Sequence, residues 1–174
     1  LSTSRKPCFR ASAAFVVLHR NELSTRVLFC NYWLIKRGIK EVNVLLSLRD
    51  AGGNVISRNS LLLAEAKSYA VYVSDLLERA GQDPSRSFEG SIECEIFSTR
   101  DLFFPFPAVV LNYFTKECVA AVHTAGRIYN DVEDMTLNSQ AAVPESGFDV
   151  LAGSRMRPFF NFVNGPFAEK GKRI

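Results

Sequence analysis

The sequence predicts a mainly β protein, an antiparallel β-sandwich of the immunoglobulin or jelly-roll kind with one short helix. The chain has 174 residues, which is long enough for one domain with a sizeable core. Its 14 Phe, with many Val, Ile and Leu, favour half-buried strands over helices. Short apolar runs are separated by turn residues, which is typical of strands joined by hairpins.

Two strands are predicted near the N-terminus. Residues 13–19 form an apolar run that ends at the polar residues 20–22. A second run, residues 26–34, is rich in aromatic and branched side chains and is broken at residues 36–38. Aromatic residues within this second strand, Phe29 and Trp33, are expected to fill the core.

A β-hairpin is the clearest local signal. Residues 42–49 and 55–63 are both extended, and Gly52 and Gly53 lie between them. Glycine supplies the positive φ that tight turns require, so these two segments are predicted to pair.

The next strand, over residues 68–73, leads into the one predicted helix, over residues 74–81. Ser74 or Asp75 is expected to cap its start, and Gly81 its end.

Residues 88–97 alternate between apolar and polar side chains. Ile92 and Ile96 are predicted to face the core, whereas Glu93 and Glu95 are predicted to face water. A strand with one wet face therefore follows the helix.

A final pair of strands is predicted over residues 109–113 and 118–124. The apolar segment before it contains Pro105 and Pro107, which bar it from a central strand because each lacks a ladder donor. We expect an edge or contact surface there, with a protein interface formed by Phe103, Phe104 and Phe106.

An internal repeat is predicted from matches at a constant offset of 133 residues (148 minus 15). On this basis residues 1–135 form the sandwich, 136–147 a linker, and 148–174 an extra β-hairpin. A lone hairpin cannot bury its apolar face, so it is expected to pack on the first domain or on a neighbouring chain. The matched pairs are Phe15/Phe148, Val17/Val150, Leu18/Leu151, Phe29/Phe162, Asn31/Asn164 and Gly38/Gly171.

The best polar cluster closes the last predicted strand. A small ligand is expected to bind through loop side chains held there by a rigid scaffold. These candidate ligand-binding residues are His123, Thr124, Arg127, Tyr129 and Asp131.

No metal site, cofactor motif or catalytic set is predicted. His19 and His123 are the only histidines, so a metal site requires the fold to bring them together, with Asp131 and Glu133. Nucleophile elbows and glycine-rich phosphate loops are missing from the sequence.

The charge of the chain indicates which partners to expect, and its cysteines indicate the compartment. The net charge of +3 is spread along the chain and gives no reason to expect binding to nucleic acid or direct membrane insertion. The four cysteines form no CxxC pair, so free thiols are expected. This slightly favours a cytoplasmic location. Export with two disulfides is the alternative.

Residues 26–130 resemble the sensory rhodopsin transducer family. The resemblance lies in the order of strands, the glycine-containing hairpin, the short Ser-Asp-Leu-Leu segment and the closing stretch with His123, Thr124 and Arg127. It implies a small β-sandwich that oligomerises and acts as a soluble interaction partner of a membrane photoreceptor. Residues 148–174 have no counterpart in that family.

Together these observations predict a non-enzymatic binding or protein-interaction module that forms a homo-oligomer. Two alternatives stay open. One is a metal-dependent or ligand-processing enzyme with a site around His123, and the other is a repeat module of a larger surface or exported protein.

Overall fold

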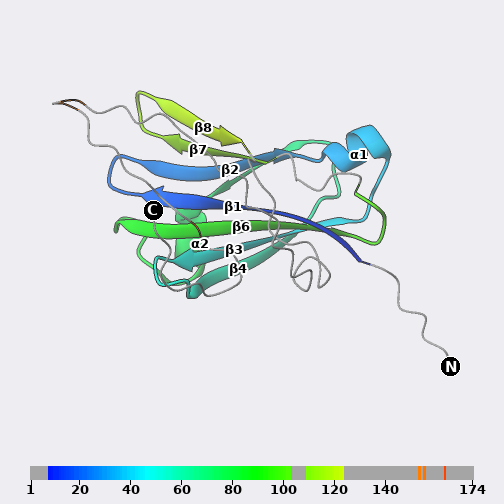
Figure 1. The fold of residues 1–174 in the computed structure, drawn as a ribbon, viewed down its shortest axis with the longest axis horizontal. Helices are drawn as coiled ribbons and strands as arrows, with labels where there is room; N and C mark the ends of the chain where they lie inside the picture. Colours follow the sequence, from blue (N-terminus) through cyan, green and yellow to red (C-terminus); the bar gives the residue numbers. More distant parts are fainter. Residues whose placement is uncertain (1–7, 103–108, 124–152, 154, 156–162, 164–174) are drawn as a thin grey trace, which may run out of the picture.

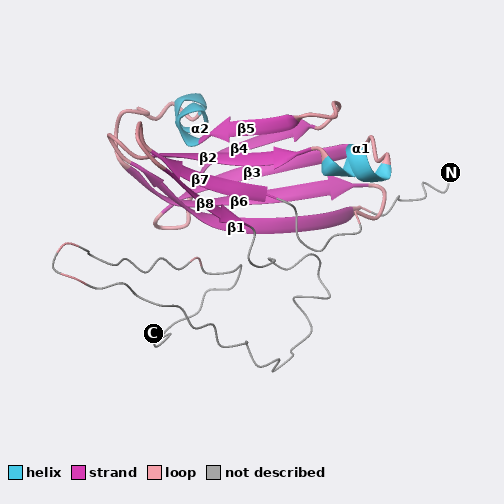
Figure 2. Cartoon of the chain, turned by 90° about the horizontal axis from the view of Figure 1, so that it is seen from above, coloured by secondary structure: helices cyan, strands magenta, loops and turns pink. Residues whose placement is uncertain are grey.

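Two four-stranded antiparallel sheets lie face to face and enclose one core, as Figures 1 and 2 show. The structure is a computed structural model that describes residues 8–102 and 109–123, with 153, 155 and 163 as isolated positions. Sheet A has the strand order β1-β6-β3-β4, and sheet B has the order β5-β2-β7-β8. The mainly β sandwich predicted from the sequence is confirmed. The strands are β1 (Phe9–His19), β2 (Ser24–Cys30), β3 (Val42–Asp50), β4 (Val55–Leu62), β5 (Ser68–Tyr72), β6 (Phe88–Ser98), β7 (Val109–Phe114) and β8 (Val119–His123).

The core lies between the inner faces of the two sheets. Alternate residues of each strand point inward, which is the period-2 pattern that the sequence carries. On β6 the inward set includes Ile92 and Ile96, both fully buried as predicted. The other strands contribute core residues that include Ala11, Ala13, Phe15, Val17, Val27, Phe29, Val44, Leu46, Leu48, Val109 and Leu111.

The predicted hairpin is present as β3 and β4. The carboxylate of Asp50 accepts a hydrogen bond from the backbone N–H of Asn54 at 2.8 Å, and Gly53 has φ 85°. The positive φ at Gly53 explains why a glycine stands at this turn.

The prediction of a single helix was wrong. A second helix, α1 (Tyr32–Arg37), replaces the end of the predicted strand over residues 26–34, and β2 stops at Cys30. The side chain of Asn31 accepts a hydrogen bond from the Leu34 N–H at 3.2 Å, and Gly38 ends the helix with φ 64°. This N-cap and the left-handed C-cap favour a helix at residues 32–37, although the apolar sequence is typical of a strand.

The predicted helix forms as α2 (Val73–Arg79), but its N-cap differs from the prediction. Tyr72 occupies the N-cap position and its side chain makes no capping bond, while Gly81 follows the helix with φ 71°. Buried side chains of Val73, Leu76 and Leu77 anchor α2 to the core, where it contacts β2, β4 and β5. Burial of this apolar face supplies the stability that the missing cap does not.

The two helices lie toward opposite ends of the strands, as both views show (Figures 1 and 2). Trp33 of α1 is 1% exposed, so the expectation that it fills the core is confirmed. Neither helix, nor any other in the described parts of the chain, is long and apolar enough to cross a bilayer. The predicted linker 136–147 and most of the predicted hairpin 148–174 lie outside the described residues.

Candidate functional site

Most of the residues predicted to bind a ligand or a partner lie outside the part of the chain that the structure describes. These are Thr124, Arg127, Tyr129 and Asp131 of the polar cluster, and Phe103, Phe104 and Phe106 of the proline-flanked segment. His123 is described, and it is the exposed last residue of β8.

The structure does not bring the two histidines together. His19 is the last residue of β1 and lies next to the β1–β2 turn, close to Ser24 at the start of β2. Ser24 in turn pairs with Phe114 of β7. His123 pairs with Val110 near the other end of β7. Phe114 and Val110 are four residues apart on β7, which corresponds to about 13 Å along the strand. One metal ion therefore cannot bind both imidazole rings.

His19 has a structural environment instead. The residue is 7% exposed, and Nε2 of its ring lies 2.8 Å from the carbonyl oxygen of Pro84. This contact ties the end of β1 to the loop before β6. Within the described residues, no group of three or more His, Cys, Asp or Glu side chains is placed to hold a metal ion.

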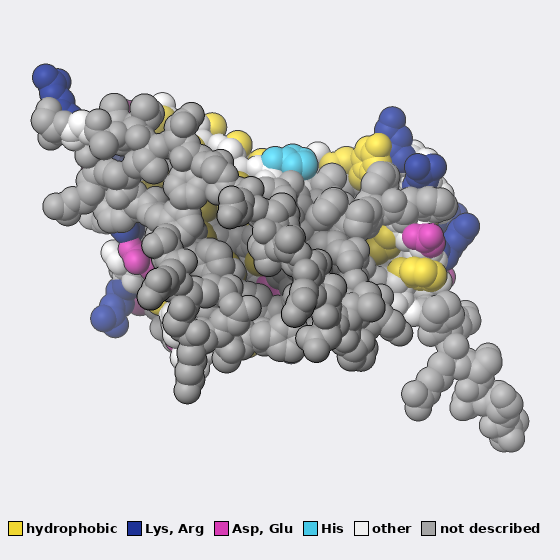
Figure 3. All heavy atoms as spheres, in the orientation of Figure 1, with side chains coloured by type: hydrophobic (Ala, Val, Ile, Leu, Met, Phe, Trp, Pro, Cys, Tyr) yellow, Lys and Arg dark blue, Asp and Glu magenta, His cyan; other side chains and the backbone are white. Residues whose placement is uncertain are grey.

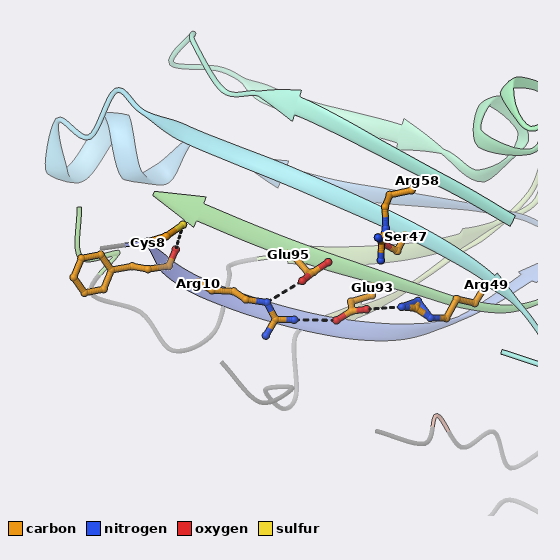
Figure 4. Close-up of polar contacts among 8 residues, drawn as sticks. Cys8, Arg10, Ser47, Arg49, Arg58, Glu93 and Glu95 are labelled. Carbon is orange, nitrogen blue, oxygen red and sulfur yellow. Dashed lines mark hydrogen bonds and ion pairs between the residues drawn. The ribbon is translucent and has the colours of Figure 1, made fainter. Parts of the chain in front are cut away.

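A charged network on the outer face of sheet A is the densest polar cluster of the described chain (Figure 4). Arg10 of β1 donates from Nε to Glu95 at 2.8 Å and from Nη2 to Glu93 at 3.0 Å. Arg49 of β3 pairs with the other oxygen of Glu93 at 3.3 Å. On β4, Arg58 donates to the hydroxyl of Ser47 at 3.2 Å. The arginine–glutamate network therefore links β1, β6 and β3, and the Arg58–Ser47 bond joins β4 to β3 beside it.

Glu93 and Glu95 lie on the outer face of sheet A, as the alternation predicts, but they are more buried than a wet face implies. Glu95 is 9% exposed, and burial is the main cause that raises the pKa of Glu93 above its ordinary value. The charge of Glu95 raises this pKa further, whereas the guanidinium groups of Arg49 and Arg10 lower it. Each carboxylate is held by at least one arginine, so we interpret the cluster as a clamp across the strands rather than a catalytic pair.

Arg10→Met is expected to destabilise the protein by about 1–3 kcal/mol at neutral pH, because it leaves two neighbouring carboxylates without their shared partner. Glu93 already has a raised pKa in the folded state, and removal of Arg10 raises it further. The folded state then binds a proton more tightly than the unfolded state. The deficit should therefore shrink as the pH falls through the folded-state pKa toward the ordinary value of 4.5. Urea unfolding of both proteins from pH 7 to pH 4 measures this change.

Arg20→Met is the matched control, since Arg20 pairs with Glu89 through side chains that are 48% and 55% exposed. Such an exposed pair is expected to contribute no more than about 1 kcal/mol. Equal losses for the two variants would contradict the proposed clamp.

The outer face of sheet B carries a different arrangement, centred on Arg26. Its guanidinium carbon lies 4.9 Å from the centroid of the Phe114 ring and 5.9 Å from that of Tyr72. Nε donates to the side-chain oxygen of Asn112 at 3.3 Å, and Nη1 donates to the Tyr72 hydroxyl at 3.4 Å. These contacts hold Arg26 across β5, β2 and β7, with the cation over aromatic faces.

An open hollow of about 720 Å³ lies between the β1–β2 turn and the β7–β8 turn. Asn21, Ser24, Phe114 and Lys116 contribute to its lining, together with two glutamates. Its polar groups carry both signs of charge, so the lining by itself selects no ligand chemistry. The hollow adjoins the start of β8.

The edge of sheet B at β8 is the most unusual surface of the described chain. All five residues of β8 are exposed, and Val119 and Val122 are 58% and 41% exposed. In a sandwich one face of a strand is ordinarily buried, yet here both faces of an uncharged strand are open. Natural proteins usually protect such an edge with charge, proline or a covering segment.

A second apolar position lies at α1, where Ile35 is 50% exposed beside the basic residues Lys36 and Arg37. Figure 3 shows basic and hydrophobic side chains gathered at this corner of the molecule. Isolated exposed apolar residues are common, so this corner is a weaker candidate than β8.

Sequence reasoning missed the charged network, Arg26 and the exposed edge. The alternation along β1, β2 and β6 identifies which side chains leave the core, but not which strands are neighbours. Val119 and Val122 carry a misleading signal, because an apolar strand predicts burial.

The geometry defines a two-sheet antiparallel sandwich with an exposed edge, and known proteins add nothing more specific. No protein family, curated protein or solved structure was found to match this chain.

Proposed function

We propose that this protein is a non-enzymatic protein-interaction module that receives an extended segment of a partner at the β8 edge of sheet B. The observation that carries the proposal is the full exposure of β8, a strand with no Asp, Glu, Lys or Arg. An extended segment can add to such an edge by backbone hydrogen bonds, and alternate side chains then give specificity.

The two faces of β8 suit this role. Val122 pairs with the buried Leu111 and points to the inner side of the sheet, whereas Val119 pairs with Phe114 on the outer side. An added strand would cover apolar surface on both sides of the edge, which favours association. The resemblance to sensory rhodopsin transducers supports the same class of function, since it implies an oligomerising sandwich.

A repeat module of a larger protein is the second candidate, and one observation favours it. Three N-terminal residues of the repeat have specific structural roles: Phe29 packs in the core, Asn31 caps the start of α1 and Gly38 caps its end. Residues 162, 164 and 171 preserve the same residue types at the same spacing. If the repeat is a true duplication, its unit is two strands followed by a capped helix. A tandem arrangement is compatible with strand addition.

The proposal is tested by titrating the isotope-labelled protein with a blocked peptide of the β8 sequence, flanked by lysines for solubility. We expect chemical-shift changes at the amides of Val119 and Ala121 at peptide concentrations of about 1 mM or below. Changes at the β4 or β5 edge should be much smaller.

Ala121→Pro is the matched control. Thr115 and Cys118 form a hydrogen-bonded pair, so the alternation along the ladder directs the Ala121 N–H away from β7. Proline at this position therefore removes a donor for the peptide without removing a bond to β7. We expect this variant to fold and to lose the peptide response. A peptide that produces no change at β8 at about 5 mM would overturn the proposed function.

A further inference from the structure

We propose that the partner at the β8 edge is a second copy of this chain, paired antiparallel about a two-fold axis at Ala121. This inference rests on the proposed function and names the partner. Sheet B of one copy would then continue into sheet B of the other, through the two β8 strands. Such a self-complementary contact closes a symmetric dimer.

The β7–β8 turn fixes which backbone groups of β8 point outward. The Thr115 N–H donates to the Cys118 carbonyl at 2.9 Å, so these two residues form a hydrogen-bonded pair of the antiparallel ladder. Such pairs alternate with non-hydrogen-bonded pairs. Phe114 and Val119 therefore form a non-hydrogen-bonded pair, as do Asn112 and Ala121.

It follows that the N–H and C=O groups of Val119 and Ala121 point away from β7, toward the outer edge. No strand of the described chain pairs with β8 on that side. A residue whose backbone groups point outward can exchange two hydrogen bonds with the residue opposite it on an added strand. Ala121 is therefore able to pair with Ala121 of a second copy.

This register also matches the side chains. With Ala121 opposite itself, Ala120 of each copy lies opposite Val122 of the other, on the inner side of the sheet. Two small side chains meet at the axis, and an exposed valine packs on an alanine at each flank. Like charges are never placed opposite each other, although each chain carries a net charge of +3.

The other described edges suit self-pairing less well. The strands β1 and β4 carry Arg10 and Arg58, and β5 is preceded directly by Lys67 and followed directly by α2. A lysine or arginine on an edge disfavours pairing with another copy. Among these edge strands, β8 is the one with no lysine or arginine in the strand or directly before it to oppose pairing with a second copy.

Light scattering after size exclusion, together with hydrogen exchange of the backbone amides, tests the inference on the full chain. At about 100 µM we expect a mass near twice the 19.4 kDa of one chain, with slow exchange at the amides of Val119 and Ala121. On dilution the dimer should dissociate, and these two amides should then exchange rapidly. The Ala120 amide, which faces β7, should stay protected in both states.

Ala121→Lys places two positive charges at the axis and is expected to weaken the dimer by about 100-fold. Ala70→Lys, on the opposite edge of the same sheet, is the matched control and should leave the dimer unchanged. Circular dichroism checks that both variants fold, and the exchange experiment on the unaltered protein needs neither variant.

A chain that stays monomeric at about 500 µM would overturn the inference. So would a dimer in which Val119 and Ala121 exchange rapidly, because its copies would meet elsewhere. In either case a positive titration with the β8 peptide would leave the proposed interaction function standing with a different partner. A negative titration would remove both.

Discussion

Gly90→Ala is expected to destabilise the protein by about 3 kcal/mol and to lower its melting temperature by about 6–12 °C. A methyl group at this position would lie 2.0 Å from the carbonyl oxygen of Arg49 and 3.1 Å from the Cα atom of Asp50. Both obstacles belong to the backbone of β3, which cannot rotate away as a side chain can. Gly90 pairs with Asp50 on one side and Val17 on the other, so β6 cannot move without disturbing a ladder. Thermal unfolding followed by circular dichroism measures the loss.

Gly52→Ala provides the control at the same end of β3. A methyl group there would meet the side chains of Asn54 at 3.2 Å and Asp50 at 3.3 Å, which lie in a surface turn and can shift more easily than backbone. We expect a change within about 0.5–1 kcal/mol. A Gly90→Ala protein as stable as the Gly52→Ala protein would show that β3 and β6 do not approach as closely as described.

Asn31→Ala should be about as damaging, at about 2–4 kcal/mol. The Asn31 side chain is fully buried and makes three contacts with the backbone. It accepts from the Leu34 N–H as the N-cap of α1, and its amide donates to the carbonyls of Leu63 at 3.0 Å and Glu65 at 3.1 Å. Alanine would leave two carbonyls without these donors and one end of α1 uncapped. Urea unfolding measures the difference in the free energy of unfolding.

Asn31→Ser separates the two roles of this side chain. Serine can still cap α1, but it cannot reach both carbonyls, so we expect it to recover about 1 kcal/mol of the loss. Exchange protection of the α1 amides should return with the serine variant and stay low with alanine. If both variants were as stable as the unaltered protein, the link between α1 and the β4–β5 connection would be unimportant.

The strands were predictable from the sequence because local chemistry specifies them. Ile92 and Ile96 stand an even number of residues apart on β6, so both point into the core and are buried. The glycines at 52 and 53 form the β3–β4 turn. These signals depend on neighbours within a few residues, and a period of two admits few other readings. The sandwich class follows from the number and spacing of such runs.

The helix α1 was not predictable in the same way. Its sequence, Tyr-Trp-Leu-Ile-Lys-Arg, is as compatible with a strand as with a helix. The caps at Asn31 and Gly38 decide between the two, and Asn31 is also held by the carbonyls of Leu63 and Glu65, more than thirty residues away. The distant contacts that hold Asn31 in place give no local signal in the sequence.

The candidate site shows the same division. The sequence identified His123 as the end of a strand, but it could not separate that residue from His19 or reveal that β8 lies open. Both facts depend on the order of strands in the two sheets, because His19 lies on β1 of sheet A and β8 is the last strand of sheet B.

The sequence by itself determined the strand content, the β3–β4 hairpin, the helix α2 and the inward-facing residues of β6, because periodicity and turn chemistry act over short distances. The tertiary structure alone decided the second helix, the pairing of Arg10 with Glu93 and Glu95, and the exposure of β8. These features require residues far apart in the chain to become neighbours, and strand order, which no local pattern encodes, sets which residues meet.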